Sequence, residues 1–306
     1  MTALASRPPT SSPSPRARGA GHVLAPVGVA ILAAGAAAAT YQVFIRMPLG
    51  QQVDTDAMRG GDVSHPKVVE VLSRTLNGTT LASLVLVCLA AVAVGALRRR
   101  LDLALAAGLL VLGANASVQL LKTRLDRPNL DDFPAPNSFP SGHTAAATSV
   151  AFAMILVLPV AVRGMVALIG AGYVTVIAVA TVWAEWHRPS DSVAALLIVL
   201  AWSALAAFLV RLRRVRVPGP AERPSRSATV LLLAAGLVAG VIGLLGLVAV
   251  AMSQHVTPDL VSGRFAFLTG SAGVAAAVAG TFLIWVRLAA GDRPAAEPAP
   301  DEGGSK

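Results

Sequence analysis

A histidine and an acidic residue lie four positions apart in Trp186-His187-Arg188-Pro189-Ser190-Asp191, where a long apolar segment begins. Pro189 suits the first turn of a helix, which would place His187 at the mouth of that helix and Asp191 about one turn further in. A carboxylate there can hold one imidazole nitrogen, fix the tautomer and leave the other nitrogen free to attack an electrophile. Taken alone, the pair could also simply cap a helix.

A second polar segment, Asn137-Ser138-Phe139-Pro140-Ser141-Gly142-His143, leads directly into another apolar stretch. The free N–H groups of a helix N-terminus and the helix dipole together favour an anion. Gly142 permits close approach of the backbone, and Ser141 adds a hydroxyl donor. An ordinary helix start explains Pro140 and Ser141, but it leaves His143 unexplained.

A third polar group ends a further apolar stretch and contains Asn115, Gln119 and Lys122, followed by Arg124 and Arg127. The first three are spaced by four and three positions, so they share one face of a helix. Such a stripe is typical of a bundle interior or a wet cavity. The alternative is a lysine that snorkels to the membrane interface beside two packing amides.

The composition identifies the elements that must position these residues. The chain has 306 residues, of which 55% are hydrophobic and only 13% charged. Ordinary soluble domains are about 25% charged, so the sequence indicates an integral membrane protein and excludes disorder for most of its length. The single cysteine, Cys88, can form no disulfide within the chain.

The sequence predicts an all-α polytopic helix bundle with eight apolar stretches of membrane-spanning length. We expect a disordered tail over 1–22, a six-helix core over 23–210, a basic linker over 211–226, two further transmembrane helices over 227–287, and a polar tail over 288–306. The eight stretches run approximately over 23–45, 79–97, 101–121, 143–162, 164–186, 190–210, 227–252 and 262–287. The first could be read as a signal peptide, but its apolar run continues past the alanines of a possible cleavage site, so we interpret it as an uncleaved helix.

The distribution of charge predicts the orientation of the bundle. With the N-terminus inside, the inner segments hold 16 of the 25 basic residues and six of the 16 acidic ones, a net charge of +10, whereas the outer segments have a net charge of −1. This pattern follows the positive-inside rule. The excess of +9 is therefore explained by membrane topology and anionic lipid, not by binding to nucleic acid. Both termini are expected in the cytoplasm, in the inner (plasma) membrane of a cell, and all three polar segments on the extracytoplasmic side.

Three polar segments on one side of the membrane suggest nucleophilic displacement at phosphorus. Cationic side chains and helix N–H groups would bind the phosphate and stabilise the transition state. His187 would be the nucleophile, oriented by Asp191, and His143 would protonate the departing oxygen and later activate water.

These residues resemble the type 2 phosphatidic acid phosphatase (PAP2) superfamily, in its membrane-bound lipid phosphatase branch. The family pattern is a lysine and an Arg-Pro pair, then Pro-Ser-Gly-His, then Ser-Arg with a downstream histidine and aspartate. Pro140 to His143 match the second motif completely, and His187 and Asp191 match the end of the third. The resemblance covers residues 23–210 and implies a phosphohistidine intermediate on His187, with Asp191 and His143 also catalytic. It implies phosphate binding by Lys122, Arg127, Ser141 and Gly142.

The sequence departs from the family pattern in two places. Four residues separate Lys122 from Arg127-Pro128, where the family usually has six. The Ser-Arg expected seven and six positions before His187 is Ala180-Thr181, so one phosphate-binding arginine is missing. Arg188 or Arg124 could compensate for it.

The expected function is hydrolysis of a lipid (di)phosphate, with an isoprenoid carrier diphosphate as the leading substrate and phosphatidic acid and phosphatidylglycerol phosphate as others. The expected partners are this lipid and the bilayer, with no cofactor and no metal, because the adjacent Asp131 and Asp132 suit a solvated loop. There are two alternatives. The protein could be a phosphotransferase with the same intermediate, or a non-catalytic relative that binds or transports lipid. The outer loop 46–78 includes a possible amphipathic piece, Pro66 to Leu76. The oligomeric state stays open, because the glycines at 236, 240, 243 and 246 could pack helices within or between chains.

Overall fold

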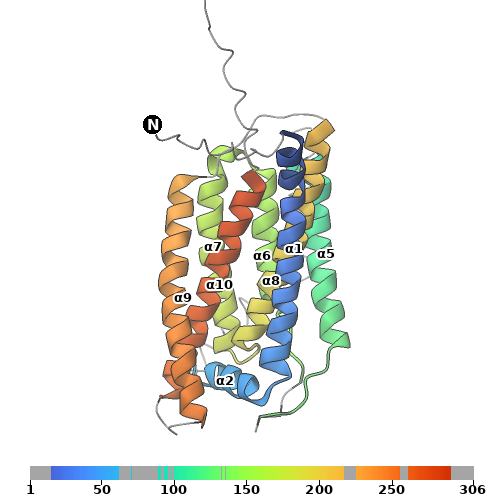
Figure 1. Cartoon of the computed structure of the whole chain (residues 1–306). Helices are drawn as coiled ribbons and strands as arrows, with labels where there is room; N and C mark the ends of the chain where they lie inside the picture. The colour runs from blue at the N-terminus through green and yellow to red at the C-terminus, as the bar shows by residue number, and fades with distance from the viewer. Residues whose placement is uncertain are drawn as a thin grey trace, which may run out of the picture.

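The protein is an all-helical bundle, shown in Figure 1. The computed structural model describes residues 15–61, 70, 89–90, 93–95, 97, 100–131, 133–134, 136–216, 225–255 and 261–290. These residues contain no β-strand. They form α1 (Pro15–Ile45), α2 (Pro48–Arg59), α5 (Leu101–Arg124), α6 (Gly142–Val157), α7 (Val160–Trp183), α8 (Pro189–Arg216), α9 (Arg226–His255) and α10 (Gly263–Ala290).

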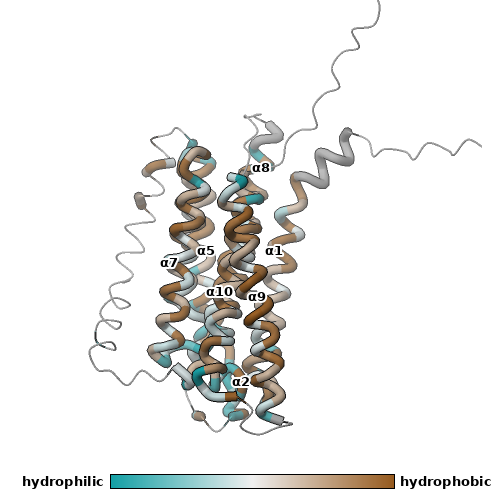
Figure 2. Tube along the Cα trace, turned by 90° about the vertical axis from the view of Figure 1, so that its left-hand side faces the viewer, coloured by the Kyte–Doolittle hydropathy of each residue, from teal (hydrophilic) through white to brown (hydrophobic). Residues whose placement is uncertain are grey.

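Six of the described helices are long and apolar enough to cross a membrane. They are α1 from Val23 onward, α5, α7, α8, α9 and α10. The shorter α6 is also apolar and lies inside the bundle, with most of its residues buried. Figure 2 shows hydrophobic residues along the lengths of the helices. The expected helix over 79–97 lies mostly outside the described residues.

The expected helix boundaries near residue 160 were wrong by several positions. We expected helices over 143–162 and 164–186, whereas α6 ends at Val157 and α7 runs from Val160 to Trp183. Pro159 explains the break, because a proline cannot continue the preceding helix and favours extended backbone before it. Leu158 has that extended conformation, with ψ of 157°. The earlier end of α7 leaves a turn of a few residues in which His187 lies.

The chain runs up and down between two ends of the bundle. In Figure 1, α1 descends to α2, and the connection from α5 to α6 and the turn from α7 to α8 lie near α2 at this same lower end. The described start of α1 and the end of α10 lie at the opposite end. The three polar segments of the sequence are therefore brought to one end of the bundle, away from Pro15 at the start of α1 and Ala290 at the end of α10.

The helix α2 was not expected, because the sequence analysis treated residues 46–78 as one outer loop. It is a 12-residue helix that begins with Pro48 at its first position and lies across the lower end of the bundle (Figure 1). Gln51, Asp54 and Thr55 are buried on it. Asp54 and Thr55 lie three and four positions after Gln51, so both neighbour it on the helix surface. The amphipathic piece expected over 66–76 lies outside the described residues.

The last two helices are packed into the bundle. The helix α10 contacts α2, α6, α7 and α8, and α9 lies against α10. Trp285 of α10 is fully buried, and its indole N–H donates to the Phe152 carbonyl of α6 at 3.0 Å. Gly243 and Gly246 of α9 face Gly273 and Thr269 of α10 so closely that a Cβ at either glycine would collide with them. These two glycines therefore serve close packing within the chain.

Candidate functional site

A tight turn between α7 and α8 determines the position of His187. The N–H groups of Trp186 and His187 both donate to the Thr181 carbonyl, at 3.0 and 3.1 Å, and Glu185 N–H donates to the Val182 carbonyl at 2.9 Å. Glu185 has a φ of 57°, the left-handed conformation that ends many helices in this way. Pro189 then begins α8. The turn leaves His187 buried, with 4% of its surface exposed.

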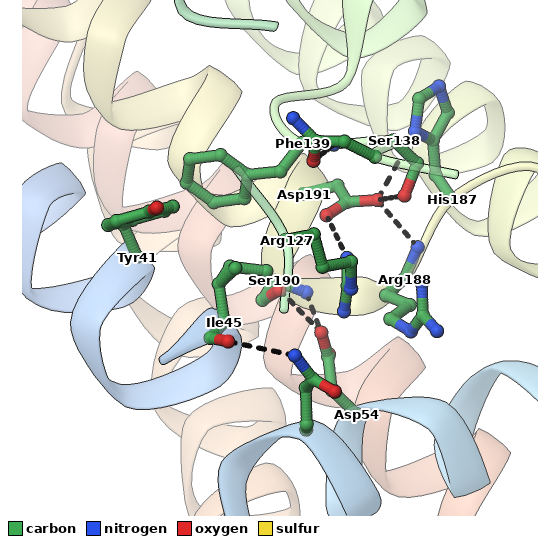
Figure 3. A network of polar contacts seen from close by, with 12 residues as sticks. Tyr41, Ile45, Asp54, Arg127, Ser138, Phe139, His187, Arg188, Ser190 and Asp191 are labelled. Atoms are coloured by element: carbon green, nitrogen blue, oxygen red, sulfur yellow. Dashed lines mark hydrogen bonds and ion pairs between the residues drawn. The ribbon is translucent and has the colours of Figure 1, made fainter. Parts of the chain in front are cut away.

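His187 and Asp191 form a hydrogen-bonded pair across the first turn of α8. Nδ1 of His187 lies 3.3 Å from Oδ2 of the fully buried Asp191. The same oxygen accepts from the Ser138 hydroxyl at 2.6 Å and from the Arg188 N–H at 3.0 Å, as Figure 3 shows. With a carboxylate on Nδ1, the neutral imidazole carries its proton there, so Nε2 keeps a free lone pair. The arrangement presents a nucleophilic nitrogen.

Arg127 lies beside this pair with its hydrogen-bonding capacity unused. Its Nη1 is 3.7 Å from Oδ1 of Asp191, and its side chain is only 3% exposed. Among the described residues, none of the three guanidinium nitrogens has a hydrogen-bond partner, and Oδ1 of Asp191 has none either. Burial lowers the pKa of Arg127, and the nearby Asp191 carboxylate opposes that shift. Buried polar groups are nearly always hydrogen-bonded, so the free donors of this guanidinium are unusual and would match the oxygen acceptors of an anion.

Arg188 is a second buried arginine at the site, but its side chain points to α2. Its Nε donates to the Thr55 hydroxyl at 2.9 Å, and its Nη2 lies 3.8 Å from Asp131. Thr181 occupies the position at which the family pattern has an arginine. It is fully buried, and its hydroxyl donates to the Ala178 carbonyl. Arg124, the other residue considered as a substitute, is exposed.

The start of α6 is joined to α8 through Ser141. Its backbone N–H donates to the Asp191 carbonyl at 3.0 Å, and its hydroxyl accepts from the Thr144 N–H at 3.3 Å as the N-cap of α6. A Cβ added at Gly142 would find only the Gln119 amide nitrogen within 4 Å, at 3.8 Å. The backbone at Gly142 is therefore open toward the side of the α5 polar stripe.

The two histidines face each other across the site. The ring centroids of His143 and His187 are 6.0 Å apart, and the His143 ring also lies 5.6 Å from the Trp186 ring. Lys122 is partly buried and lies within electrostatic range of His143. Of the α5 stripe, Asn115 donates to the Ser149 hydroxyl of α6 at 3.0 Å, which is a packing role.

Asp54, which was not expected at the site, supports the start of α8 from α2. Its carboxylate accepts from both the backbone N–H (3.0 Å) and the hydroxyl of Ser190. Burial, with a further contribution from the negative charge of Asp191, raises the pKa of Asp54 to about 7. The spacing of Gln51, Asp54 and Thr55 was the available signal, because it puts three polar side chains on one face of a short helix.

Gln51 was also missed, and it fixes the loop that carries Arg127. Its side-chain amide donates to the carbonyls of Ile45 at 2.8 Å and Pro128 at 2.7 Å, and its carbonyl oxygen accepts from the Leu130 N–H at 3.0 Å. A fully satisfied buried amide of this kind rigidifies its surroundings. The loop geometry around Arg127 therefore depends on α2.

The described residues contain no cluster of three histidine, cysteine, aspartate or glutamate side chains that could hold a metal ion. Asp131 instead accepts from the Thr55 hydroxyl and lies near Arg188. Asp132 lies outside the described residues.

Residues 103–216 match the family model described as the PAP2 superfamily. This part of the chain is a PAP2 domain. It spans α5 to α8 and contains Lys122, Arg127, His143, His187 and Asp191, whereas α2, α9 and α10 lie outside it. No curated protein and no solved structure matches the chain. The PAP2 domain and the apolar helices together indicate a membrane protein of the lipid phosphatase type.

Proposed function

We propose that the protein hydrolyses a lipid (di)phosphate through a phosphohistidine intermediate on His187, with an isoprenoid carrier diphosphate as its leading substrate. The observation that carries this proposal is the unsatisfied guanidinium of Arg127, which is buried beside the His187–Asp191 pair. A buried cation with free donors next to a nucleophilic imidazole suits a phosphoryl group, whose oxygens can accept those hydrogen bonds.

In the first step, Nε2 of His187 attacks phosphorus and the bond from phosphorus to the leaving oxygen breaks. His143, on the other side of the site, donates a proton to that oxygen, so the lipid departs as an alcohol or as a monophosphate. The two imidazole rings are neighbours, with centroids 6.0 Å apart. A phosphoryl group bound at one ring would therefore lie within reach of the other.

In the second step, His143 takes a proton from water, and the water oxygen attacks phosphorus as the P–N bond breaks. Inorganic phosphate leaves, and His187 returns to its neutral form. Throughout, Nδ1 of His187 donates to Oδ2 of Asp191, so the carboxylate stabilises the positive charge that the ring acquires. Ser138 and the Arg188 N–H hold the carboxylate in place.

The phosphate oxygens would be bound by Arg127, Lys122 and the N–H groups at the start of α6, around Ser141 and Gly142. Arg188 lies within electrostatic range of Arg127 and adds positive charge where the family arginine is missing. It does so at a fixed position, because Thr55 and Asp131 hold its guanidinium. We infer that Arg188 replaces the missing arginine electrostatically rather than by direct contact.

The sidedness of the site follows from charge. The site lies at the end of the bundle away from the described start of α1 and end of α10 (Figure 1), and basic residues are concentrated in the segments at those termini. The positive-inside rule then places both termini in the cytoplasm and the site on the extracytoplasmic face. We propose that 23–210 form the catalytic core. The basic stretch 211–226 joins it to the last two helices, and the first part of this stretch continues α8 to Arg216.

The test is phosphate release by purified protein in detergent micelles with EDTA, using polyprenyl diphosphate, phosphatidic acid and phosphatidylglycerol phosphate. We expect metal-independent release that His187→Ala abolishes, with a ³²P label that is trapped on wild-type protein and lost in the variant. Appreciable release by His187→Ala would contradict the mechanism. Label transferred to an added alcohol instead of water would identify a phosphotransferase, and no release from any lipid would favour a non-catalytic relative.

A further inference from the structure

An apolar cavity of about 180 Å³ lies between the PAP2 domain and the last two helices. Its walls come from the end of α1, α2, the start of α8, α9 and α10, and include Phe44, Val53, Val193, Val250 and Val274. Protein interiors are normally packed with few voids larger than a water molecule. A gap of this size at a helix interface is therefore a specific feature of the fold.

The cavity lies next to the phosphate site. Asp54 and Ser190 line one of its walls, and both polar atoms of the Asp54 carboxylate are occupied by hydrogen bonds from Ser190. Ser190 directly precedes Asp191, whose carboxylate holds His187. One hydrogen-bonded pair therefore stands between the cavity and the catalytic pair, and this pair presents no free polar atom of Asp54 to the cavity.

The gap is local to one stretch of α10. A Cβ at Gly270 would lie 2.8 Å from Pro189 and 2.9 Å from Ala57, so the helices touch there. A Cβ at Gly273, which also lines the cavity, would meet no heavy atom within 4 Å. The close contact at Gly270 holds α10 against α2 and α8. At Gly273 the backbone packs against Gly243 of α9 on one side and has open space on the side to which a Cβ would point.

Hydrocarbon is the occupant that this space favours. Water requires two to four polar partners, and the walls are almost entirely apolar. The exposed face of α9 carries Leu237, Leu244 and Leu245, as expected for a helix in contact with lipid. A cavity walled by such a helix and close to the proposed phosphate site suits the hydrocarbon chain of a molecule whose head is a phosphate.

We propose that the cavity binds the part of the lipid's hydrocarbon chain nearest the phosphate, with α9 and α10 as the wall that selects it. This inference rests on the proposed function for the identity of the head group. It gives the last two helices a role in substrate selection, and it makes Gly273 and Ala277, one turn further along α10, specificity-determining positions.

The test uses the full chain in lipid nanodiscs and a polyprenyl phosphate with a photoreactive diazirine in its first isoprene unit. Gly273→Leu and Ala277→Leu fill the cavity. Gly280→Leu is the matched control, because a Cβ there also meets nothing within 4 Å but Gly280 does not line the cavity. Thermal unfolding of each variant checks that it is folded. We expect labelling of α9 and α10 peptides that falls about tenfold in either cavity variant and stays unchanged in Gly280→Leu.

The same variants are compared in phosphate release. Release from the long-chain lipid should fall about tenfold in Gly273→Leu, while release from a short, water-soluble phosphate ester should not change. If Gly273→Leu does not reduce the photolabelling of α9 and α10, the cavity is not the binding site, whatever the phosphatase activity of the variant. Equal competition by a polyprenyl alcohol without phosphate would also overturn it, since the space would then hold any bilayer lipid. Gly273-dependent labelling without release from any substrate would support the cavity and contradict hydrolysis.

Discussion

Asp54 on α2 accepts two hydrogen bonds from Ser190, the residue that precedes the catalytic aspartate candidate Asp191 on α8. The contact joins a helix outside the PAP2 domain to the turn of the chain that presents His187. It also places a second buried carboxylate close to Asp191. Burial, with a further contribution from the Asp191 charge, raises the pKa of Asp54 to about 7. Two further contacts of the same helix, Gln51 to Pro128 and Thr55 to Arg188, reach the rest of the site.

We expect the titration of Asp54 to make the protein less stable as the pH rises. The pKa of this carboxyl is ordinarily 3.8 and rises to about 7 in the folded protein, so between these values the folded state binds more protons than the unfolded state. Stability from this group is full below about pH 4 and is lost progressively up to about pH 7. The melting temperature in detergent should fall across this window in wild type and fall less in Asp54→Asn, which keeps an acceptor for Ser190. Parallel pH profiles of the two proteins would contradict the assignment.

Asp191→Asn should reduce turnover by about 10³- to 10⁴-fold without unfolding the protein, because the amide no longer enforces the tautomer with the proton on Nδ1 of His187. Ser138→Ala removes one of the three donors to the same oxygen and should cost no more than about tenfold. The measurement is kcat with the best lipid substrate. A larger loss in Ser138→Ala than in Asp191→Asn would show that Asp191 does not act through His187.

Arg127→Ala should lower kcat by about 10²- to 10³-fold, the usual cost of removing one donor from a charge-stabilising site. Arg127→Lys should recover little of it, because an ammonium cannot present the planar fork of donors that a phosphoryl group receives from a guanidinium. Arg124→Ala is the matched control: it lies three positions away on the exposed surface and should leave kcat unchanged. Inorganic phosphate should protect wild type against thermal unfolding and fail to protect Arg127→Ala. If it protects both equally, Arg127 is not the anion ligand.

Glu185→Gly should stabilise the protein by about 1 kcal/mol, because Glu185 occupies the left-handed conformation that costs an L-residue about 1–2 kcal/mol and glycine almost nothing. Glu185→Ala retains the backbone penalty and should not stabilise. Thermal unfolding of the three proteins in the same detergent decides the question. Stabilisation by both variants would trace the effect to the side chain of Glu185 and not to its backbone.

The membrane bundle and its motif residues could be predicted because they depend on local patterns. Apolar stretches of about 20 residues specify membrane helices, and the order of Lys122, His143 and His187 along them matched a known pattern. The structure brings Arg127, His143, His187 and Asp191 to one end of the bundle, and their catalytic roles stay predictions.

The contribution of α2 could not be predicted by the same means. Its twelve residues are too few for a membrane span, and their burial depends on α8 and α10, which are distant in sequence. The unsatisfied state of Arg127 is likewise a property of the packed bundle, since the sequence alone cannot say which donors find acceptors. The boundary between α6 and α7 was missed for a local reason, because the break at Pro159 was underestimated.

The burial of Trp285 against Phe152 bears on how the chain can be divided for experiment. Phe152 belongs to α6, within the residues that match the family, and Trp285 belongs to α10, well beyond them. Removal of the last two helices would strip a fully buried indole from the PAP2 domain and uncover Gly164 and Gly170 of α7, which pack against Ala228 and Phe282. The stretch that matches the family is thus smaller than the stretch that must be expressed together, and a fragment trimmed to residues 103–216 should aggregate or be degraded.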